Sequence, residues 1–318
     1  VFEGDIEFTS QNFLTLPKGD TTQRGRGRGL LGGSNDGSPF SNSIQFITIQ
    51  SQGNSIDFGD LSEARSRASS YASSTRGIWA GGNPETDRID FVTIATTGNA
   101  TDFGNLTVAR LFCSGTSSAT RGLSVGGYSS PTVVNVIDFT TIASAGDAQD
   151  FGDLLVKKSA VGALSSPTRA VFGGGYQVRN PSAATNDITF LTIATTGNSA
   201  DFGDLTINKR FLNGVSSNTR GVFSSGSHPA QKNIIDFITI ASAGDATDFG
   251  DATIANEHRA GISNSIRGVN AGSGTPAIGN TIDFITIATT GDAVDFGDTT
   301  TNMGYSAGCS DSHGGLSE

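Results

Sequence analysis

The chain has 318 residues, including 43 Gly, 20 Phe, 2 Cys and 3 His, and its formal net charge is −10. The acidic balance argues against binding to a nucleic-acid backbone, which requires a clustered basic face. Two thiols and three histidines at wide spacing offer neither a zinc site nor a disulfide framework, so we interpret Cys113 and Cys309 as small buried residues. No stretch approaches 18 consecutive apolar residues, which excludes a membrane-spanning helix from the expected elements. Abundant Gly together with Phe, Ile, Thr and Ser predicts short strands joined by tight turns.

The N-terminal residues resemble part of a strand pattern that recurs later. Residues Val1 to Gly4 show neither a basic segment nor a long apolar one, so no signal peptide is visible. The missing initiator Met indicates a processed chain or a fragment of a longer polypeptide. Residues Gly4 to Thr9 match a strand found again at Gly279 to Ile285.

The rest of the chain is built from one repeat. The tripeptide Asp-Phe-Gly occurs six times at a mean spacing of about 47.6 residues, within the range of about 40–50 residues per propeller blade. Each copy follows a run such as Ile89 to Asn99, and a second unit such as Ser74 to Gly82 lies between these runs. The repeat therefore predicts four strands, of which the third, Ile-Asp-Phe-x-Thr-Ile-Ala, is apolar on both faces. Such a strand is expected where neighbouring sheets cover both of its faces.

The C-terminal residues Tyr305 to Glu318 match the first strand of a repeat and the start of the second. We therefore predict a seventh blade that is split between residues 1–20 and 303–318, with residues around 4–18 in the same sheet as the C-terminal segment. The predicted fold is an all-β, seven-bladed, kelch-like β-propeller with four strands per blade. It forms a single domain over residues 1–318, closed by pairing of the N- and C-terminal strands.

Two resemblances follow from these motifs. The order of Arg, apolar strand, Gly-Gly, variable loop, apolar strand, turn and closing segment is similar to the kelch repeat, with the Phe of Asp-Phe-Gly where kelch blades carry Tyr and Trp. The run Thr93 to Arg110 resembles Gly-rich repeats in virion proteins of marine tailed phages such as cyanophages, and this resemblance covers about residues 20–318. It implies a tail-fibre or other virion-surface protein whose partners are other virion proteins or a host-surface glycan. We also expect a part of a longer polypeptide or a homo-oligomer. The acidic net charge predicts no nucleic-acid partner, and the lack of a long apolar stretch predicts no membrane insertion.

Two polar columns repeat once per blade. The first is an Arg at the start of the second strand: Arg76, Arg121, Arg169, Arg220 and Arg267. The second is the Asp of Asp-Phe-Gly: Asp57, Asp102, Asp150, Asp201, Asp248 and Asp295. A charge repeated in every blade is typical of architecture, so we expect each Arg to pair with an Asp of its own or a neighbouring blade.

The acidic residues also raise the question of a metal. Asp245, Asp248 and Asp251 offer oxygen ligands for a structural calcium ion. Residues i and i+3 of a strand point to opposite faces, however. We therefore expect these side chains to accept hydrogen bonds and predict no cofactor, with calcium as the alternative.

The sequence contains no evident nucleophile, base and acid set, because His228, His258 and His313 lie in different repeats. We therefore expect a non-enzymatic structural or host-recognition protein. The alternatives are a lectin-like or kelch-type interaction module of non-viral origin and a glycan-cleaving propeller. The loop between the second and third strands varies most in length, and variable loops on a repeated scaffold usually carry function. The candidate binding residues in these loops are Tyr128, Tyr176, Arg179 and His228.

Overall fold

The described part of the chain consists of short strands joined by turns and loops. The computed structural model describes residues 27–35, 40–177 and 183–316, which form 26 β-strands and no helix. The predicted all-β class is confirmed for these residues. None of them belongs to a helix that is long and apolar enough to cross a membrane.

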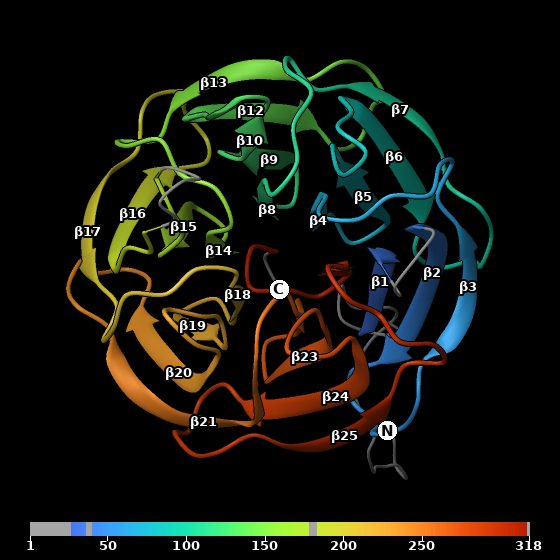
Figure 1. Ribbon diagram of the computed structural model, residues 1–318. Coiled ribbons are helices and arrows are strands. Elements are labelled where there is room, and N and C mark those ends of the chain that lie inside the picture. The colour runs from blue at the N-terminus through green and yellow to red at the C-terminus, as the bar shows by residue number, and fades with distance from the viewer. Residues whose placement is uncertain (1–26, 36–39, 178–182, 317–318) are drawn as a thin grey trace, which may run out of the picture.

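Within the described residues, six four-stranded antiparallel sheets surround one axis as the blades of a β-propeller (Figure 1). We call the strands of a blade a to d from the axis outward. Blade 1 contains β26 (Ala307–Ser310), β1 (Arg28–Asn35), β2 (Phe40–Thr48) and β3 (Ile56–Asp60). Blade 2 contains β4 (Ser69–Ala72), β5 (Arg76–Ala80), β6 (Arg88–Thr93) and β7 (Thr101–Asn105). Blade 3 contains β8 (Ser114–Ser117), β9 (Arg121–Val125), β12 (Val136–Thr141) and β13 (Gln149–Asp153), with a small hairpin of β10 (Tyr128–Ser129) and β11 (Thr132–Val133) in its b–c loop.

The other three blades follow the same order. Blade 4 contains β14 (Gly162–Ser165), β15 (Arg169–Gly173), β16 (Asp187–Thr192) and β17 (Ala200–Asp204). Blade 5 contains β18 (Asn213–Ser216), β19 (Arg220–Ser224), β20 (Lys232–Thr239) and β21 (Thr247–Asn256). Blade 6 contains β22 (Ala260–Ser263), β23 (Arg267–Ser273), β24 (Gly279–Thr286) and β25 (Val294–Asp298).

The prediction of seven blades is wrong for the described residues, which form six. The residues around 4–18 that we expected in the closing sheet lie outside the described part of the chain. The C-terminal strand β26 pairs with β1, where Cys309 lies opposite Leu30. The six copies of Asp-Phe-Gly lie in six d strands, but no described segment of the first repeat forms its strand a. Strand β26 therefore completes the first blade and closes the ring, instead of starting a seventh blade.

Small residues line the inner strands and allow them to approach closely. The second residues of the six a strands are Ser70, Gly115, Ala163, Gly214, Gly261 and Gly308. A Cβ atom added to Gly115 would overlap the backbone of Ser70, and one added to Gly214 would overlap the backbone of Ala163. Larger side chains would push the inner strands apart, so these positions keep the central channel narrow.

Apolar side chains fill the space between neighbouring blades. One cluster joins Leu30 and Phe58 of blade 1 to Trp79 and Ile94 of blade 2. Strand c is buried on both faces, as expected for a strand between neighbouring sheets. The Phe of Asp-Phe-Gly packs edge-on against the Phe of strand c in all six blades, with ring centroids 5.7–6.1 Å apart. Burial of these aromatic and aliphatic side chains is the main source of stability that the strands share.

Backbone hydrogen bonds also join the blades at the outer rim. The N–H groups of Gly98 and Ala100, in the c–d turn of blade 2, donate to the carbonyls of Phe58 and Asp60 in strand d of blade 1, at 2.8 and 2.7 Å. The same two bonds recur at all six interfaces between described blades. Gly59 has φ of 147°, and a Cβ atom there would lie 2.5 Å from the carbonyl oxygen of Gly98. The close approach of the turn therefore requires the Gly of Asp-Phe-Gly.

Candidate functional site

The Arg at the start of each b strand contacts two blades. Arg121 Nη1 donates to the carbonyls of Ile193 and Ala194 in the next blade, at 2.9 and 3.1 Å. Its guanidinium carbon lies 4.5 Å from the ring centroid of Phe139 in its own blade. Equivalent contacts are made by Arg28, Arg76, Arg169, Arg220 and Arg267. The partners are therefore backbone carbonyls and Phe rings instead of the aspartates that we expected, and these contacts hold adjacent blades together.

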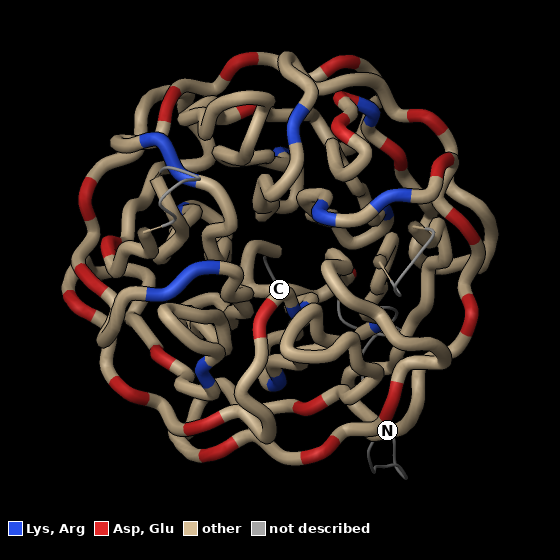
Figure 2. The backbone as a smooth tube through the Cα atoms, in the orientation of Figure 1, with Lys and Arg blue, Asp and Glu red and all other residues tan. Residues whose placement is uncertain are grey.

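The Asp of each Asp-Phe-Gly is exposed on the rim, where acidic residues are spaced around the perimeter (Figure 2). One of the six, Asp102, forms an ion pair with Arg88 at 3.0 Å. The neighbouring acidic residues serve the turns, since Asp245 Oδ1 accepts the N–H of Asp204 in the preceding blade at 3.0 Å. Among the described residues, no three His, Cys, Asp or Glu side chains are grouped so that they could hold a metal ion.

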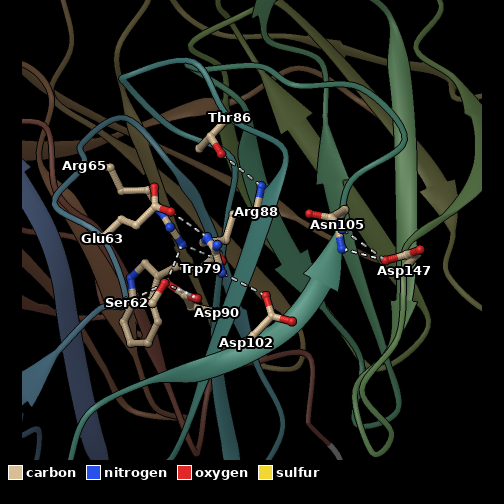
Figure 3. Close-up of polar contacts among 10 residues, drawn as sticks. All are labelled: Ser62, Glu63, Arg65, Trp79, Thr86, Arg88, Asp90, Asp102, Asn105 and Asp147. Atoms are coloured by element: carbon tan, nitrogen blue, oxygen red, sulfur yellow. Dashed lines mark hydrogen bonds and ion pairs between the residues drawn. The ribbon is translucent and has the colours of Figure 1, made fainter.

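The sequence reasoning missed a buried ion pair between Arg65, in the segment that joins β3 to β4, and Asp90 in strand c of blade 2 (Figure 3). Arg65 Nη2 lies 3.0 Å from Asp90 Oδ2 in strand β6, and the two side chains are 1% and 0% exposed. The N–H and hydroxyl of Ser62 also donate to the Asp90 carboxylate, and Arg65 donates to the carbonyl of Trp79. Burial lowers the pKa of Arg65 from its ordinary value, although the negative charge of Asp90 opposes this shift.

The same pair recurs with changes in position. Its other members are Arg110–Asp138, Lys158–Asp187, Lys209–Asp236 and Arg259–Asp283. In blade 6 the cation is Arg259, which lies three residues later in the repeat than its equivalents, and in blade 4 the acid is Asp187, two residues earlier. Blade 1 has neutral residues at both places, Gln45 and Met303, and the Gln45 amide instead bonds to Thr301 at 3.1 Å. Cation and anion are thus kept or lost together, as expected because an unpaired buried charge is costly.

The structure places three of the four predicted binding-loop residues, Tyr128, Tyr176 and His228, on one face but not all at its surface. The b–c loops and d–a segments share this face because the start of a b–c loop pairs with a d–a segment in each blade. Tyr128 is half-buried, His228 is partly exposed, and Arg179 lies outside the described residues. Tyr176 is only 2% exposed, and its ring packs against Phe211 at 5.6 Å. We expected Tyr176 to be available for binding, but its side chain is buried and packs against its neighbours instead.

On this same face, one residue from each blade surrounds the mouth of the channel, two positions before strand a. The six are Arg67, Phe112, Ala160, Phe211, His258 and Tyr305. All six have φ between 57° and 62°, a region that non-Gly residues seldom adopt. Each N–H donates to the carbonyl of the equivalent residue in the preceding blade at 2.9–3.3 Å, and the six bonds form a closed ring. The backbone therefore repeats at the mouth, whereas the side chain changes from blade to blade.

Several of these side chains form a continuous stack. The guanidinium carbon of Arg67 lies 4.3 Å from the ring centroid of Tyr305. The rings of Tyr305 and His258 are 4.1 Å apart, and those of His258 and Phe211 are 3.9 Å apart. The guanidinium of Arg210 lies 5.2 Å from the Phe211 ring, so an arginine stands at each end of the stack. Three aromatic rings and two guanidinium groups are thus brought together at the mouth, a combination that suits a ligand with an apolar part and a negative charge.

Phe112 completes the mouth from blade 3. Its ring centroid lies 5.4 Å from that of Phe211 and 5.9 Å from that of His258, which belongs to blade 6 across the axis. We call Arg67, Phe112, Phe211, His258 and Tyr305 the mouth cluster. A cavity of about 120 Å³ lies at the mouth, lined by this cluster and by the first residues of the a strands.

No protein-family model and no curated protein matches the chain. The functional argument therefore depends on the geometry of the mouth and on the repeat. Aligning the six repeats gives a signal for the mouth, because the residue two positions before strand a reads Arg, Phe, Ala, Phe, His and Tyr. The sequence analysis compared loop lengths instead, and loop length does not indicate which side chain occupies this position.

Two positive charges, Arg67 and Arg210, and one negative charge, Glu257, lie close to His258 at the mouth. Burial lowers the pKa of His258 well below its ordinary value, and the charges of Arg67 and Arg210 lower it further. The carboxylate of Glu257 lies 3.7 Å from the His258 Nε2, but burial is the largest cause of the shift and the pKa of His258 is lowered. His258 is therefore neutral near pH 7 and acts as an aromatic member of the stack.

The opposite end of the channel is filled by residues 311–316. The ring Nε2 of His313 lies 2.9 Å from the carbonyl oxygen of Ala72 and 3.2 Å from Ser117 Oγ. The N–H of Gly314 donates to the carbonyl of Ser216, and Leu316 is buried. A ligand would therefore reach the cavity from the face that carries the mouth cluster.

Proposed function

We propose that this chain is a non-enzymatic recognition propeller of a virion surface, in a tail fibre or another appendage. It contacts a host-surface glycan or another virion protein through the mouth cluster and the surrounding b–c loops. The proposal rests on one comparison between two parts of the propeller. The Arg contacts between blades and the turn contacts at the rim recur in every blade. At the mouth, the backbone is the same in every blade but the side chains differ. On a repeated scaffold, the positions that differ between repeats are usually the ones that bind a partner.

The chemistry of the mouth cluster supports binding as its role. Its members are partly exposed, and they include rings with flat faces as well as the charged Arg67. A structural plug needs only apolar packing, which the Phe rings would supply, whereas recognition sites combine aromatic surfaces with Arg. The rim contacts keep the blades fixed, so the mouth is held on a rigid support.

The assignment to a virion depends on the resemblance of Thr93 to Arg110 to repeats of phage virion proteins. An interaction module of non-viral origin would use the same face and remains the alternative. A glycan-cleaving propeller is the third candidate, and no arrangement of carboxylates in the described residues favours it over binding.

The test compares purified wild-type protein with a Tyr305→Ala variant and with an Arg88→Ala control. Arg88 is a partly exposed residue that pairs with Glu63 and Asp102 away from the mouth. Mass spectrometry of purified phage particles shows whether the chain is a virion component. We then expect labelled wild-type and Arg88→Ala protein to bind host cells and Tyr305→Ala protein to lose binding while its circular dichroism spectrum is unchanged.

Two results would contradict the proposal. Equal cell binding by folded Tyr305→Ala protein would remove the mouth from the contact surface. Release of sugar fragments from the bound glycan by the wild-type protein would favour the enzyme alternative.

A further inference from the structure

The distribution of charge over the molecule directs anionic groups toward the mouth. Figure 2 shows Asp and Glu spaced around the outer perimeter, whereas Lys and Arg lie mostly closer to the axis. Five of these cations are buried in ion pairs with aspartates, and the six Arg residues at the starts of the b strands bond to carbonyls of the next blade. Arg67 and Arg210, in contrast, flank the stack at the mouth. Both arginines lie close enough to His258 to affect it, and the Glu257 carboxylate, 3.7 Å from His258 Nε2, opposes only one of these two positive charges. A single negative group is therefore attracted to the mouth and repelled by the rim.

The stack also sets a requirement on the shape of the ligand. The rings of Tyr305, His258 and Phe211 lie within 4.1 Å of their neighbours in the stack, and all three residues line the cavity. Arg67 has five N–H donors in a planar fork, which suits the two oxygens of a carboxylate even when some donors already have partners. A ligand that combines a ring with an apolar C–H face and one carboxylate would use both features.

The size of the cavity limits how much of a ligand can enter. The cavity of about 120 Å³ is small compared with a chain of several sugar units, so we place only the end of a ligand in it. The acidic rim and the net charge of −10 also disfavour a polymer that carries a charge on every unit.

We propose that the mouth cluster binds the terminal residue of a saccharide when that residue is a sugar acid. The carboxylate faces Arg67, and the ring of the sugar lies against the aromatic stack. This inference rests on the proposed function, because it names the class of glycan that the same face recognises.

The test uses two probes that differ in one group, methyl β-glucuronide and methyl β-glucoside. Binding is measured by saturation-transfer NMR and by titration with the wild-type protein, an Arg67→Gln variant and an Arg88→Gln control. We expect the wild-type and control proteins to bind the glucuronide at least tenfold more tightly than the glucoside. We expect Arg67→Gln to weaken glucuronide binding at least tenfold and to leave the weak glucoside binding unchanged. Added salt should weaken the binding of the glucuronide but not that of the glucoside.

Three outcomes would overturn the inference: equal affinity for the two sugars, glucuronide binding that persists in Arg67→Gln protein, and no binding of either sugar. If no sugar binds while Tyr305→Ala still abolishes cell binding, the recognition propeller stands and the sugar-acid ligand is wrong. If the glucuronide binds through Arg67 but the protein does not bind cells, the sugar-acid site stands and the host-recognition role is wrong.

Discussion

Replacing Arg65 by Met should destabilise the propeller strongly, because Asp90 would keep its buried position without a cation. The two side chains are 1% and 0% exposed and 3.0 Å apart, so solvent cannot replace the lost partner. Removing one member of a buried ion pair costs about 3–5 kcal/mol. That loss is a large part of the total of about 5–15 kcal/mol that stabilises a typical domain.

The chain itself supplies the design for a compensating variant. At the interface that closes the ring, Gln45 and Met303 occupy the positions of the acid and the cation. The double variant Arg65→Met with Asp90→Gln copies that neutral arrangement into blade 2. We expect its loss of stability to be smaller than the sum of the two single losses, with a coupling of about 1–3 kcal/mol.

Urea unfolding, followed by circular dichroism and by the fluorescence of the single tryptophan, Trp79, measures these differences. Arg88→Met is the control, because its ion pairs are partly exposed and should contribute less than about 1 kcal/mol. The reasoning is refuted if Arg65→Met is no less stable than Arg88→Met, or if the double variant loses as much as the two single variants combined.

Three other predictions use the same unfolding measurements. The unfolded chain protonates His258 at its ordinary pKa of about 6.5 and the folded protein only at lower pH, so the unfolded state binds more protons in that window. Stability should therefore fall as pH drops below about 6.5, by up to about 1.4 kcal/mol per pH unit, and a His258→Phe variant should lack this part of the pH dependence. Arg121→Ala should lower stability by about 1–3 kcal/mol through its lost carbonyl and Phe contacts, and an unchanged unfolding midpoint would exclude a structural role. Gly104→Ala should unfold at lower urea concentration than Gly98→Ala, because only the Cβ at Gly104 meets the neighbouring turn, 2.5 Å from the Gly146 carbonyl; equal midpoints would show that backbone strain alone matters.

The regular features of the fold could be predicted from the sequence, because each depends on residues within one repeat. The two apolar faces of strand c and the spacing of Asp-Phe-Gly indicated a propeller of four-stranded blades. The number of blades was harder, since strand a is a run of four small residues such as Ala307–Ser310 with little pattern of its own. Whether that strand completes the first blade or starts another is decided by packing around the ring.

The mouth cluster could not be predicted in the same way, because its members come from different repeats and meet only at the axis. Phe112 and His258 are far apart in the chain, yet their rings are 5.9 Å apart. Burial of Tyr176 likewise depends on Phe211 in the next blade. The buried ion pairs were missed because the Asp of strand c follows an apolar residue and precedes Phe, a context that indicated only a strand.

The c–d turns that hydrogen-bond to strand d of the preceding blade have a consequence for crowded surroundings. An unpaired outer strand is a template on which another chain can add a strand, and this is a common route to aggregation. In the described blades, every outer strand already receives two backbone bonds from the neighbouring turn. Many copies packed side by side would therefore have few backbone groups through which to pair. At these outer strands, contacts between copies or with a partner would then depend on side chains, which can make them specific.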